Sequence, residues 1–175
     1  MKRNEGLSLI ELIVVIAIMG VLVSVVGISV TVVSRQKVSN AASDVRGQFQ
    51  TAQTIAMSKD NCYMQIQENS DGDTVFTIHA SDETVLDRVT VSNKISVSVG
   101  YGGSTVNAGS VDVIRIYYNR ESGAFSEAYI NGGASATDKG NLVPTTDRVI
   151  ESIRFSNGSK SVTLHLTKLT GKVSY

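Results

Sequence analysis

The sequence is poor in several residue types on which enzymes and disulfide-bonded domains depend. Its 175 residues include one cysteine, one proline, two histidines and no tryptophan. The single cysteine, Cys62, excludes an internal disulfide framework. His79 and His165 are far apart and have no neighbouring cluster of acids or cysteines, so their spacing indicates neither a metal site nor a catalytic site. We therefore expect no enzyme and no cofactor.

The sequence also has no excess of either positive or negative charge. Lysine and arginine number 16, and aspartate and glutamate also number 16, which gives a formal net charge of zero. A neutral chain has no general basic field that would attract nucleic acid. The charges are unevenly placed, because Glu11 is the only charged residue between Leu7 and Val33. A carboxylate at membrane depth costs about 2.5–3.5 kcal/mol on insertion scales, so such an acid usually has a function and a partner.

Three interpretations of the N-terminal segment are open. A secretory signal has a basic stretch, an apolar core of about 7–15 residues and a cleavage site. Lys2 and Arg3 fit that pattern, but the apolar run over 12–33 is too long for it. A plain membrane anchor needs about 20 apolar residues, which the run supplies, but it leaves Gly6 and Glu11 unexplained. The third interpretation explains both residues.

The stretch from Gly6 to Gly20 resembles the prepilin (class III) signal of type IV pilins and type II secretion pseudopilins. It joins a short charged leader, a glycine, a glutamate at a fixed spacing and a long apolar run. The resemblance implies cleavage after Gly6, methylation of the new N-terminal residue Leu7, and a role in filament assembly for Glu11, the fifth mature residue. The chain departs from the family in having Leu7 where phenylalanine or methionine is usual, and in lacking a proline in this segment.

A helix is expected to continue beyond the apolar run. Apolar residues recur in steps of four and three, as on one face of an α-helix, at Val38, Ala42, Val45, Phe49, Ala52 and Ala56. The only proline, Pro144, lies far downstream. The pattern predicts one helix over about residues 9–58, on the order of 75 Å long. Its first half would suit lipid or a bundle of like helices, and its amphipathic second half would suit the surface of a sheet.

After Asn61 the apolar period changes to two, which is typical of strands. The predicted strands are 62–67, 75–80, 84–91, 95–101, 113–118, 125–130, 150–155, 161–167 and 171–175, and 131–147 is predicted to be a long exposed loop. A long helix followed only by strands predicts an α+β fold, with the helix packed on an antiparallel sheet. The expected parts are a leader at 1–6, a transmembrane and assembly half at 7–33, an amphipathic half at 34–60 and a β-rich domain at 61–175.

The C-terminal strands suggest a binding alternative. They resemble the end of the GspH/FimT group of minor pilins, with paired strands closed by Gly171-Lys172-Val173. Because some members of that group capture DNA, the resemblance makes Lys160, Lys168 and Lys172 candidates for phosphate contacts. Three such contacts would give weak, salt-sensitive binding. We favour an ordinary solvated basic edge over a DNA site.

Calcium binding is the other candidate in the globular part. Asp71-Gly72-Asp73 has two closely spaced acids, but it lacks the third acid and the terminal glutamate of an EF-hand loop. A hairpin turn is the favoured interpretation of this segment. Asp138 and Asp147, in the predicted long loop, are a further place where calcium could bind. We expect no metal at either place.

The resemblance implies a structural subunit, a minor pilin or a pseudopilin, of a type IV pilus or type II secretion filament. Its expected partners are other pilin subunits, a prepilin peptidase and methyltransferase, the membrane-embedded assembly machinery and the inner or cell membrane. Lys2 and Arg3 would keep the precursor's N-terminus cytoplasmic, and the mature chain would end in an extracellular or periplasmic filament. Two alternatives stay open: a DNA-binding minor pilin of a DNA-uptake pilus, and a membrane-anchored ectodomain unrelated to filaments.

Overall fold

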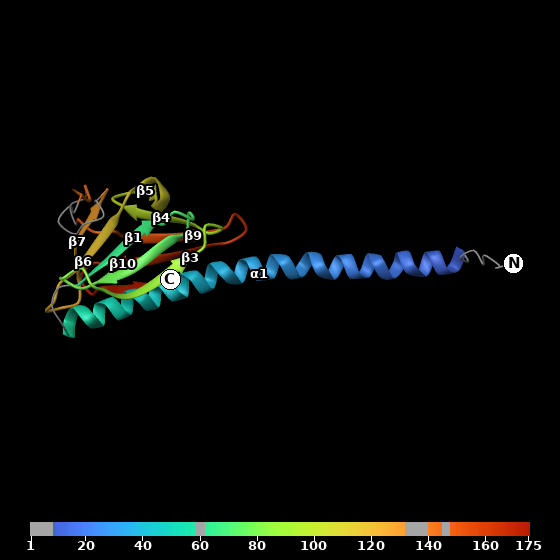
Figure 1. The fold of residues 1–175 in the computed structure, drawn as a ribbon, viewed down its shortest axis with the longest axis horizontal. Helices are drawn as coiled ribbons and strands as arrows, with labels where there is room; N and C mark the ends of the chain where they lie inside the picture. The colour runs from blue at the N-terminus through green and yellow to red at the C-terminus, as the bar shows by residue number, and fades with distance from the viewer. Residues whose placement is uncertain (1–8, 59–61, 132–139, 145–147) are drawn as a thin grey trace.

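A computed structural model describes residues 9–58, 62–131, 140–144 and 148–175, without the side chains of 24–33. One long helix projects far beyond a β-rich globular domain that packs on its C-terminal part (Figure 1). The α+β fold expected from the change of apolar period is therefore confirmed.

Helix α1 runs without a break from Leu9 to Ser58, as the sequence pattern predicts. At 1.5 Å per residue its 50 residues extend over about 75 Å. The six positions predicted to share one face are at most 1% exposed: Val38, Ala42, Val45, Phe49, Ala52 and Ala56. Burial of this apolar stripe, rather than helix propensity alone, holds the second half of α1 against the globular domain.

The strands form two antiparallel sheets. The six-stranded sheet has the order β3-β2-β1-β6-β7-β8. It consists of β1 Tyr63–Glu68, β2 Thr74–His79, β3 Val85–Val91, β6 Ile114–Tyr118, β7 Phe125–Ile130 and β8 Asn141–Leu142. The five-stranded sheet has the order β11-β10-β9-β4-β5. It consists of β4 Ser96–Tyr101, β5 Ser104–Asn107, β9 Ser152–Ser156, β10 Ser161–Thr167 and β11 Lys172–Ser174, and a short 3-10 turn, η1 Ala108–Ser110, follows β5.

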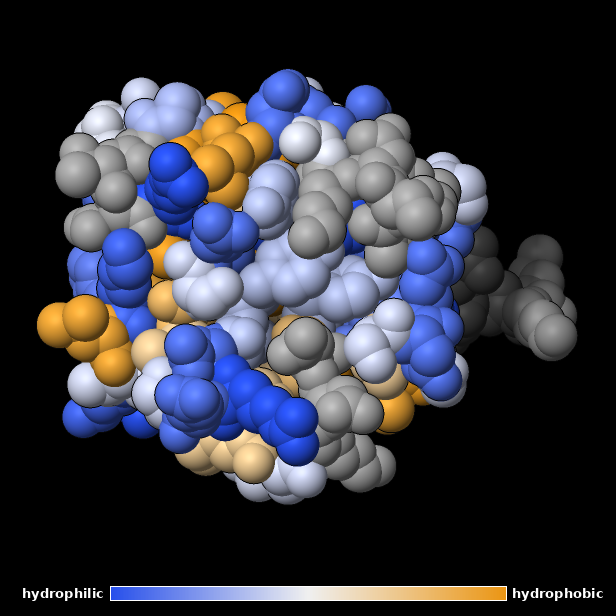
Figure 2. All heavy atoms as spheres, turned by 90° about the vertical axis from the view of Figure 1, so that its left-hand side faces the viewer, coloured by the Kyte–Doolittle hydropathy of each residue, from blue (hydrophilic) through white to orange (hydrophobic). Residues whose placement is uncertain are grey.

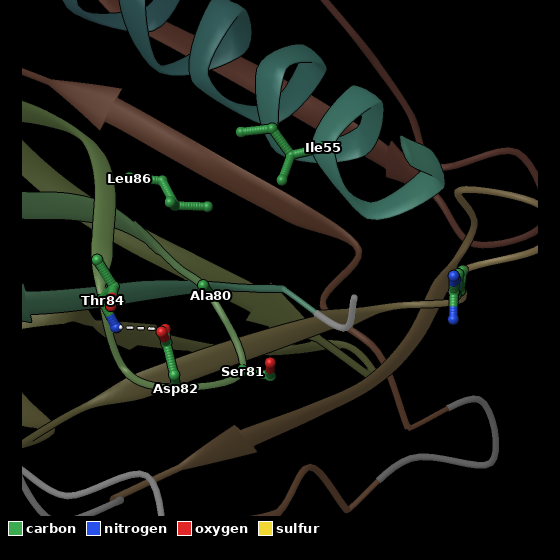
Figure 3. A pocket seen from close by; sticks show the side chains of 7 residues that line it. Ile55, Ala80, Ser81, Asp82, Thr84 and Leu86 are labelled. Carbon is green, nitrogen blue, oxygen red and sulfur yellow. Dashed lines mark hydrogen bonds between the residues drawn. The ribbon is translucent and has the colours of Figure 1, made fainter. Parts of the chain in front are cut away.

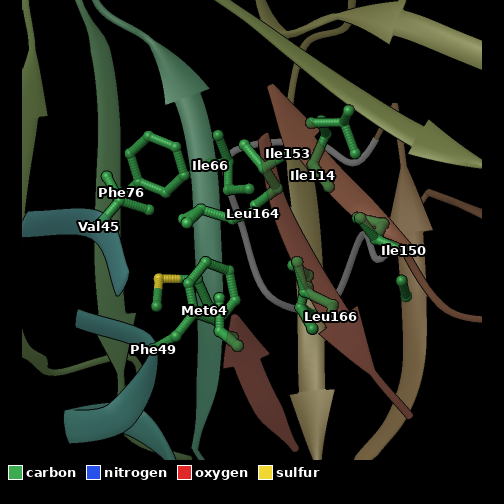
Figure 4. Packing of buried hydrophobic residues seen from close by; sticks show 14 of the residues in the cluster. Val45, Phe49, Met64, Ile66, Phe76, Ile114, Ile150, Ile153, Leu164 and Leu166 are labelled. Atoms are coloured by element: carbon green, nitrogen blue, oxygen red, sulfur yellow. The ribbon is translucent and has the colours of Figure 1, made fainter. Parts of the chain in front are cut away.

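The hydrophobic core lies where the two sheets and the helix meet. Figure 4 shows Val45 and Phe49 of α1 directed toward side chains of both sheets. Across the gap between the sheets, the rings of Phe76 and Phe155 lie with their centroids 6.2 Å apart. All four side chains are fully buried, so the helix serves as a third wall of the core.

Side chains of the helix also bind to both sheets at their edges. Arg46 donates from Nε to the carbonyl oxygen of Val173 in edge strand β11 at 3.1 Å. At the opposite edge, the Gln48 amide, with its nitrogen toward Asp87 Oδ2, accepts the backbone N–H of Arg88 in β3 at 3.2 Å. The helix therefore spans from an edge of one sheet to an edge of the other.

The structure differs from the sequence-based expectation in three details. A single sheet was expected, whereas β4 leaves the first sheet's strands and pairs with β9, so that Val97 lies opposite Phe155. Strand β5 was not predicted. The stretch predicted as an exposed loop includes β8 and the buried Val143, while 132–139 and 145–147 lie outside the described residues. Pairing between distant strands depends on tertiary contacts, which alternation along one strand does not report.

Candidate functional site

The first part of α1 presents its apolar side chains to the surroundings. From Leu9 to Val23 every residue is exposed, and the large apolar side chains are between 47% and 77% exposed. Monomeric soluble proteins rarely expose apolar patches above a few hundred Å², and larger ones mark interaction or membrane surfaces. The globular domain buries nothing of this segment, so its apolar surface is available for another environment.

Within the described residues, no helix offers a stretch that is both long enough and apolar enough to cross a membrane. The segment predicted to be transmembrane, 7–33, includes residues 7 and 8 and the side chains of 24–33, which lie outside the described part. The transmembrane character of 7–33 therefore stays a prediction.

Glu11 is the acid of this apolar segment, and it lies in the first turn of α1. A shallow hollow of about 300 Å³ is formed by Glu11 with Ile10, Val14 and Val15. A carboxylate near a helix N-terminus is stabilised by the helix dipole, typically by about 0.3–1 kcal/mol at an exposed position. Glu11 is thus an acid on an otherwise apolar surface, where a cation approaching along the helix could reach it. The predicted cleavage and methylation positions, Gly6 and Leu7, lie outside the described residues.

The three candidate DNA-binding lysines do not form one patch. Lys160 lies before the start of β10, where its Nζ donates to Ser39 Oγ of α1. Lys168 and Lys172 lie beyond the other end of β10, whose seven residues extend over about 23 Å. A DNA strand that contacted all three would have to follow the whole length of β10. This arrangement does not favour the DNA-binding alternative, which remains a prediction.

The acids considered for calcium serve a hairpin turn. The side-chain oxygen of Asn69 accepts the backbone N–H groups of Asp71 and Asp73 at 3.0 and 2.8 Å. Asp73 Oδ1 in turn accepts the backbone N–H of Asn93 at 2.9 Å. In the part of the chain that the structure describes, no three His, Cys, Asp or Glu side chains are grouped closely enough to hold a metal. The other two candidates, Asp138 and Asp147, lie outside that part.

Cys62 is a buried core residue. Its side chain is 1% exposed, and Sγ donates to the carbonyl oxygen of Ala52 at 3.3 Å. Burial raises the pKa of the Cys62 thiol from 9.0 to about 11, so it stays protonated at neutral pH. Since the thiolate is the reactive form, this cysteine is inert in the folded domain. Packing rather than chemistry explains its position.

Sequence reasoning missed a hollow at the end of α1. A space of about 490 Å³ is lined by Ile55 of the helix, by the β2–β3 turn and by Leu86, and Arg120 reaches it from the β6–β7 turn. Figure 3 shows Asp82 hydrogen-bonded to the backbone of Thr84 in this turn. That bond, at 3.0 Å, lowers the pKa of the Asp82 carboxyl, so the acid stabilises its own turn. Three segments far apart in the sequence make the hollow, so a linear pattern could not indicate it.

Arg115 is a second feature that the sequence analysis did not single out. It is fully buried, donates from Nε to Gln65 Oε1 at 3.1 Å and has its guanidinium 5.9 Å from the centre of the Tyr63 ring. Its place between Ile114 and Ile116 in an alternating strand would have indicated that it faces the side of the sheet opposite the core. A buried, hydrogen-bonded arginine at this position is part of the architecture of β1 and β6.

The comparison with protein-family models decides the class of the N-terminal segment. Residues 1–27 match the prokaryotic N-terminal methylation motif. The chain carries a class III signal of the type IV pilin and pseudopilin kind. Comparison with curated proteins and with solved structures gave no match. The motif supports a pilin-like precursor, and a motif of this type implies processing by a prepilin peptidase and assembly into pilin filaments.

The residues that match the methylation motif include Gly6, Leu7 and Glu11. Their individual roles in cleavage, methylation and assembly stay predictions, as does the resemblance of β10 and β11 to the GspH/FimT group. The end of the domain away from the N-terminus differs from the exposed apolar half of α1. Outside the parts drawn in grey, Figure 2 shows hydrophobic residues there only as separate small groups among hydrophilic ones.

Proposed function

We propose that the chain is a structural subunit, a minor pilin or a pseudopilin, of a type IV pilus or type II secretion filament. The observation that supports this most strongly is the exposed apolar half of α1, with Glu11 in its first turn, directly after a class III signal. A surface of this kind needs an apolar environment, which lipid supplies before assembly and a bundle of like helices supplies afterwards. The globular domain would then face outward from the filament.

Processing would link the two states. A prepilin peptidase cuts after Gly6, the new N-terminal Leu7 is methylated, and membrane-embedded machinery moves the subunit into the filament. Cleavage removes Lys2 and Arg3 and creates a positively charged amine four residues before Glu11. The same cut therefore removes the cytoplasmic charges of the leader and supplies a cation for the acid.

The energy of a charge pair is sufficient for this role. At an effective dielectric constant of about 20, opposite unit charges about 4 Å apart attract by about 4 kcal/mol. That is comparable to the cost of about 2.5–3.5 kcal/mol for placing a carboxylate at membrane depth. We propose that Glu11 of one subunit pairs with the amine of Leu7 in its neighbour, so that only processed subunits assemble.

The experiment that tests the proposal separates cleavage from assembly. Glu11→Ala and Glu11→Leu should be cleaved nearly as well as the original chain but should not enter filaments, because the charge partner is gone. Cleavage is measured by mass spectrometry of the N-terminus, and incorporation by shearing cells and immunoblotting the sheared fraction.

Two matched variants sharpen the result. Glu11→Gln keeps the size of the side chain without the charge and should fail like the alanine variant, whereas Glu11→Asp keeps the charge and should retain part of the incorporation. Normal incorporation of the Ala, Leu and Gln variants would rule out the proposed charge pair.

The assignment to a minor rather than a major subunit rests on the C-terminal strands. Strands β10 and β11 pair antiparallel, with Thr167 opposite Lys172, and the tight turn between them has Gly171 at φ +63°. These are the features for which the tail resembles the GspH/FimT group. Counting this subunit against the main filament protein in purified filaments tests the assignment, since a minor subunit would be present in far fewer copies.

A further inference from the structure

A small polar hollow lies where α1 leaves the globular domain. It has a volume of about 280 Å³ and is lined by Ser34 and Lys37 of the helix, Lys94 and Ile95 of the β3–β4 turn, and Asn157 and Ser159 of the β9–β10 turn. We call these six residues the neck hollow. Two lysines and two serines from three separate segments line it, and their ammonium and hydroxyl groups are donors of the kind that phosphate oxygens accept from.

The turns that supply these groups are firmly held. The Asn157 side chain donates to the carbonyl oxygen of Ser34 at 2.8 Å and accepts the backbone N–H groups of Ser159 and Lys160 at 3.1 and 3.0 Å. On the other side, the backbone N–H of Ile95 donates to the carbonyl oxygen of Ser92 at 2.9 Å. Hydrogen bonds therefore fix the backbone of both turns, which places Lys94 and Ser159 beside Ser34 and Lys37 of the helix.

The charge around the neck is mainly positive. Arg35, Lys37 and Lys94 are exposed, and Lys160 is partly exposed beside them. Among the described residues, Lys37 and Lys94 have no ion pair. The acid on this side of the helix is Asp44, which lines a neighbouring hollow together with both lysines.

Two further acids, Asp71 and Asp73, lie beyond Asn93. The side chain of Asn93 donates to the carbonyl oxygen of Asp71, and Asp73 accepts the backbone N–H of Asn93. These two acids reduce the positive charge of this side of the domain. They do not line the neck hollow, whose two charged residues are lysines.

The position of the hollow along the helix indicates the source of the phosphate. The apolar run over 12–33 rises about 33 Å, close to the roughly 30 Å thickness of a bilayer's hydrocarbon core. Ser34 and Lys37 follow within one turn, at the height of the lipid headgroups if the run is embedded. Each lysine or arginine close to an anionic membrane surface contributes about 1 kcal/mol of attraction.

We propose that the neck hollow binds the phosphate of anionic phospholipids on the outward face of the membrane, and so seats the subunit before assembly. The inference rests on the proposed function, because it requires that the apolar half of α1 is embedded as in a pilin precursor. It assigns a role to Lys37 and Lys94 that the filament role does not need.

The test uses the full-length chain in lipid vesicles and a membrane-impermeant reagent that acylates lysine. Mass spectrometry then gives the acylation rate of each lysine. Replacing part of the phosphatidylcholine by phosphatidylglycerol should slow acylation of Lys37 and Lys94 by about fivefold. Lys172, at the other end of β10, serves as the internal reference and should be unchanged. High salt should remove the protection, since the attraction is electrostatic.

Variants and a second arm complete the experiment. Lys94→Gln should weaken the protection of Lys37, whereas the control Lys172→Gln should not. Protection of Lys37 and Lys94 by inorganic phosphate without vesicles would assign the hollow to a free anion and overturn the lipid source. Equal rates in both vesicle types, with the chain floating with the vesicles, would overturn the neck site and leave the membrane anchor intact. A chain that does not float with vesicles would overturn the anchor and the neck site together.

Discussion

Gly171 and Gly123 meet at a crowded junction near the C-terminal end of α1. An added Cβ on Gly171 would overlap the carbonyl oxygen of Gly123 and lie 2.8 Å from Nε2 of Gln53. Gln53 itself donates to the carbonyl oxygen of Thr170 at 2.7 Å. Gly171 also has φ +63°, a conformation that glycine adopts without strain. This residue thus allows the helix, the β6–β7 turn and the β10–β11 turn to approach one another.

Gly171→Ala should therefore destabilise the domain by at least about 2 kcal/mol, from left-handed backbone strain of about 1–2 kcal/mol and overpacking of about 1–3 kcal/mol. Gly158→Ala is the matched control, because Gly158 has φ +81° but open space around its Cβ position. It should show the backbone strain alone. Chemical denaturation of both variants measures the difference, and equal losses would show that the junction is not crowded.

Cys62 should make the stability of the domain decrease as the pH rises through the alkaline range. Burial raises the pKa of its thiol from 9.0 to about 11, so the folded state binds this proton more tightly than the unfolded chain does. The resulting stabilisation is complete below about pH 9 and is lost as the pH rises through about 11. In Cys62→Ala, the free energy of unfolding should decline less over this interval than in the original chain. Parallel pH-dependent slopes in urea titrations would contradict this, whatever the absolute stability of the variant.

Among whole elements, the second half of α1 depends on a single buried face. Phe49 is fully buried, and its ring meets that of Phe125 edge to face at 6.0 Å between centroids. Phe49→Ala should cost about 3–5 kcal/mol, because a large side chain is removed from a packed core. Its exposed neighbour provides the control: Gln50→Ala should change stability by no more than about 0.5 kcal/mol. Thermal or urea unfolding distinguishes them, and similar stabilities would mean that the face does not hold the helix.

The second half of α1 could be predicted because its apolar residues keep one period from Val38 to Ala56. Strands such as β7 and β10 could be predicted for the same reason, with a period of two. Strands β5 and β8 have four and two residues, too few to show a period. The division into two sheets depends on the pairing of β4 with β9, which are separated by 50 residues of chain.

Across the whole molecule, the N-terminal motif could be predicted from the sequence, whereas the neck hollow could not. Gly6, Leu7 and Glu11 belong to one linear motif, so a short stretch of sequence contains the whole pattern. The neck hollow is built from Ser34, Lys94 and Ser159, which come together only when both sheets have packed against α1. A lysine in a turn has no distinguishing pattern in the sequence, and its neighbours become known only from the fold.

The proposed processing changes the whole chain, and the residue before the predicted cut should control it. Gly6→Ala should still be largely cleaved, because a methyl group adds little bulk at the scissile bond. Gly6→Val should remain uncleaved, since its branched side chain crowds the peptidase. Mass spectrometry of the intact chain distinguishes a mature N-terminus at Leu7 from one at Met1 or Lys2. A chain that is never cut would favour the membrane-anchored ectodomain without a filament role.

The exposure of Leu9–Val23 means that one helix is subject to two kinds of selection. Substitutions in this segment meet no neighbour within the globular domain, so natural variation there would be restricted only by what surrounds the helix in the cell. Substitutions after Ser34 act first on the folding and stability of the globular domain. In a survey of variants, the melting temperature would reveal defects caused by substitutions after Ser34. It would not reveal defects caused by substitutions in Leu9–Val23, because those variants would be well folded and yet inactive.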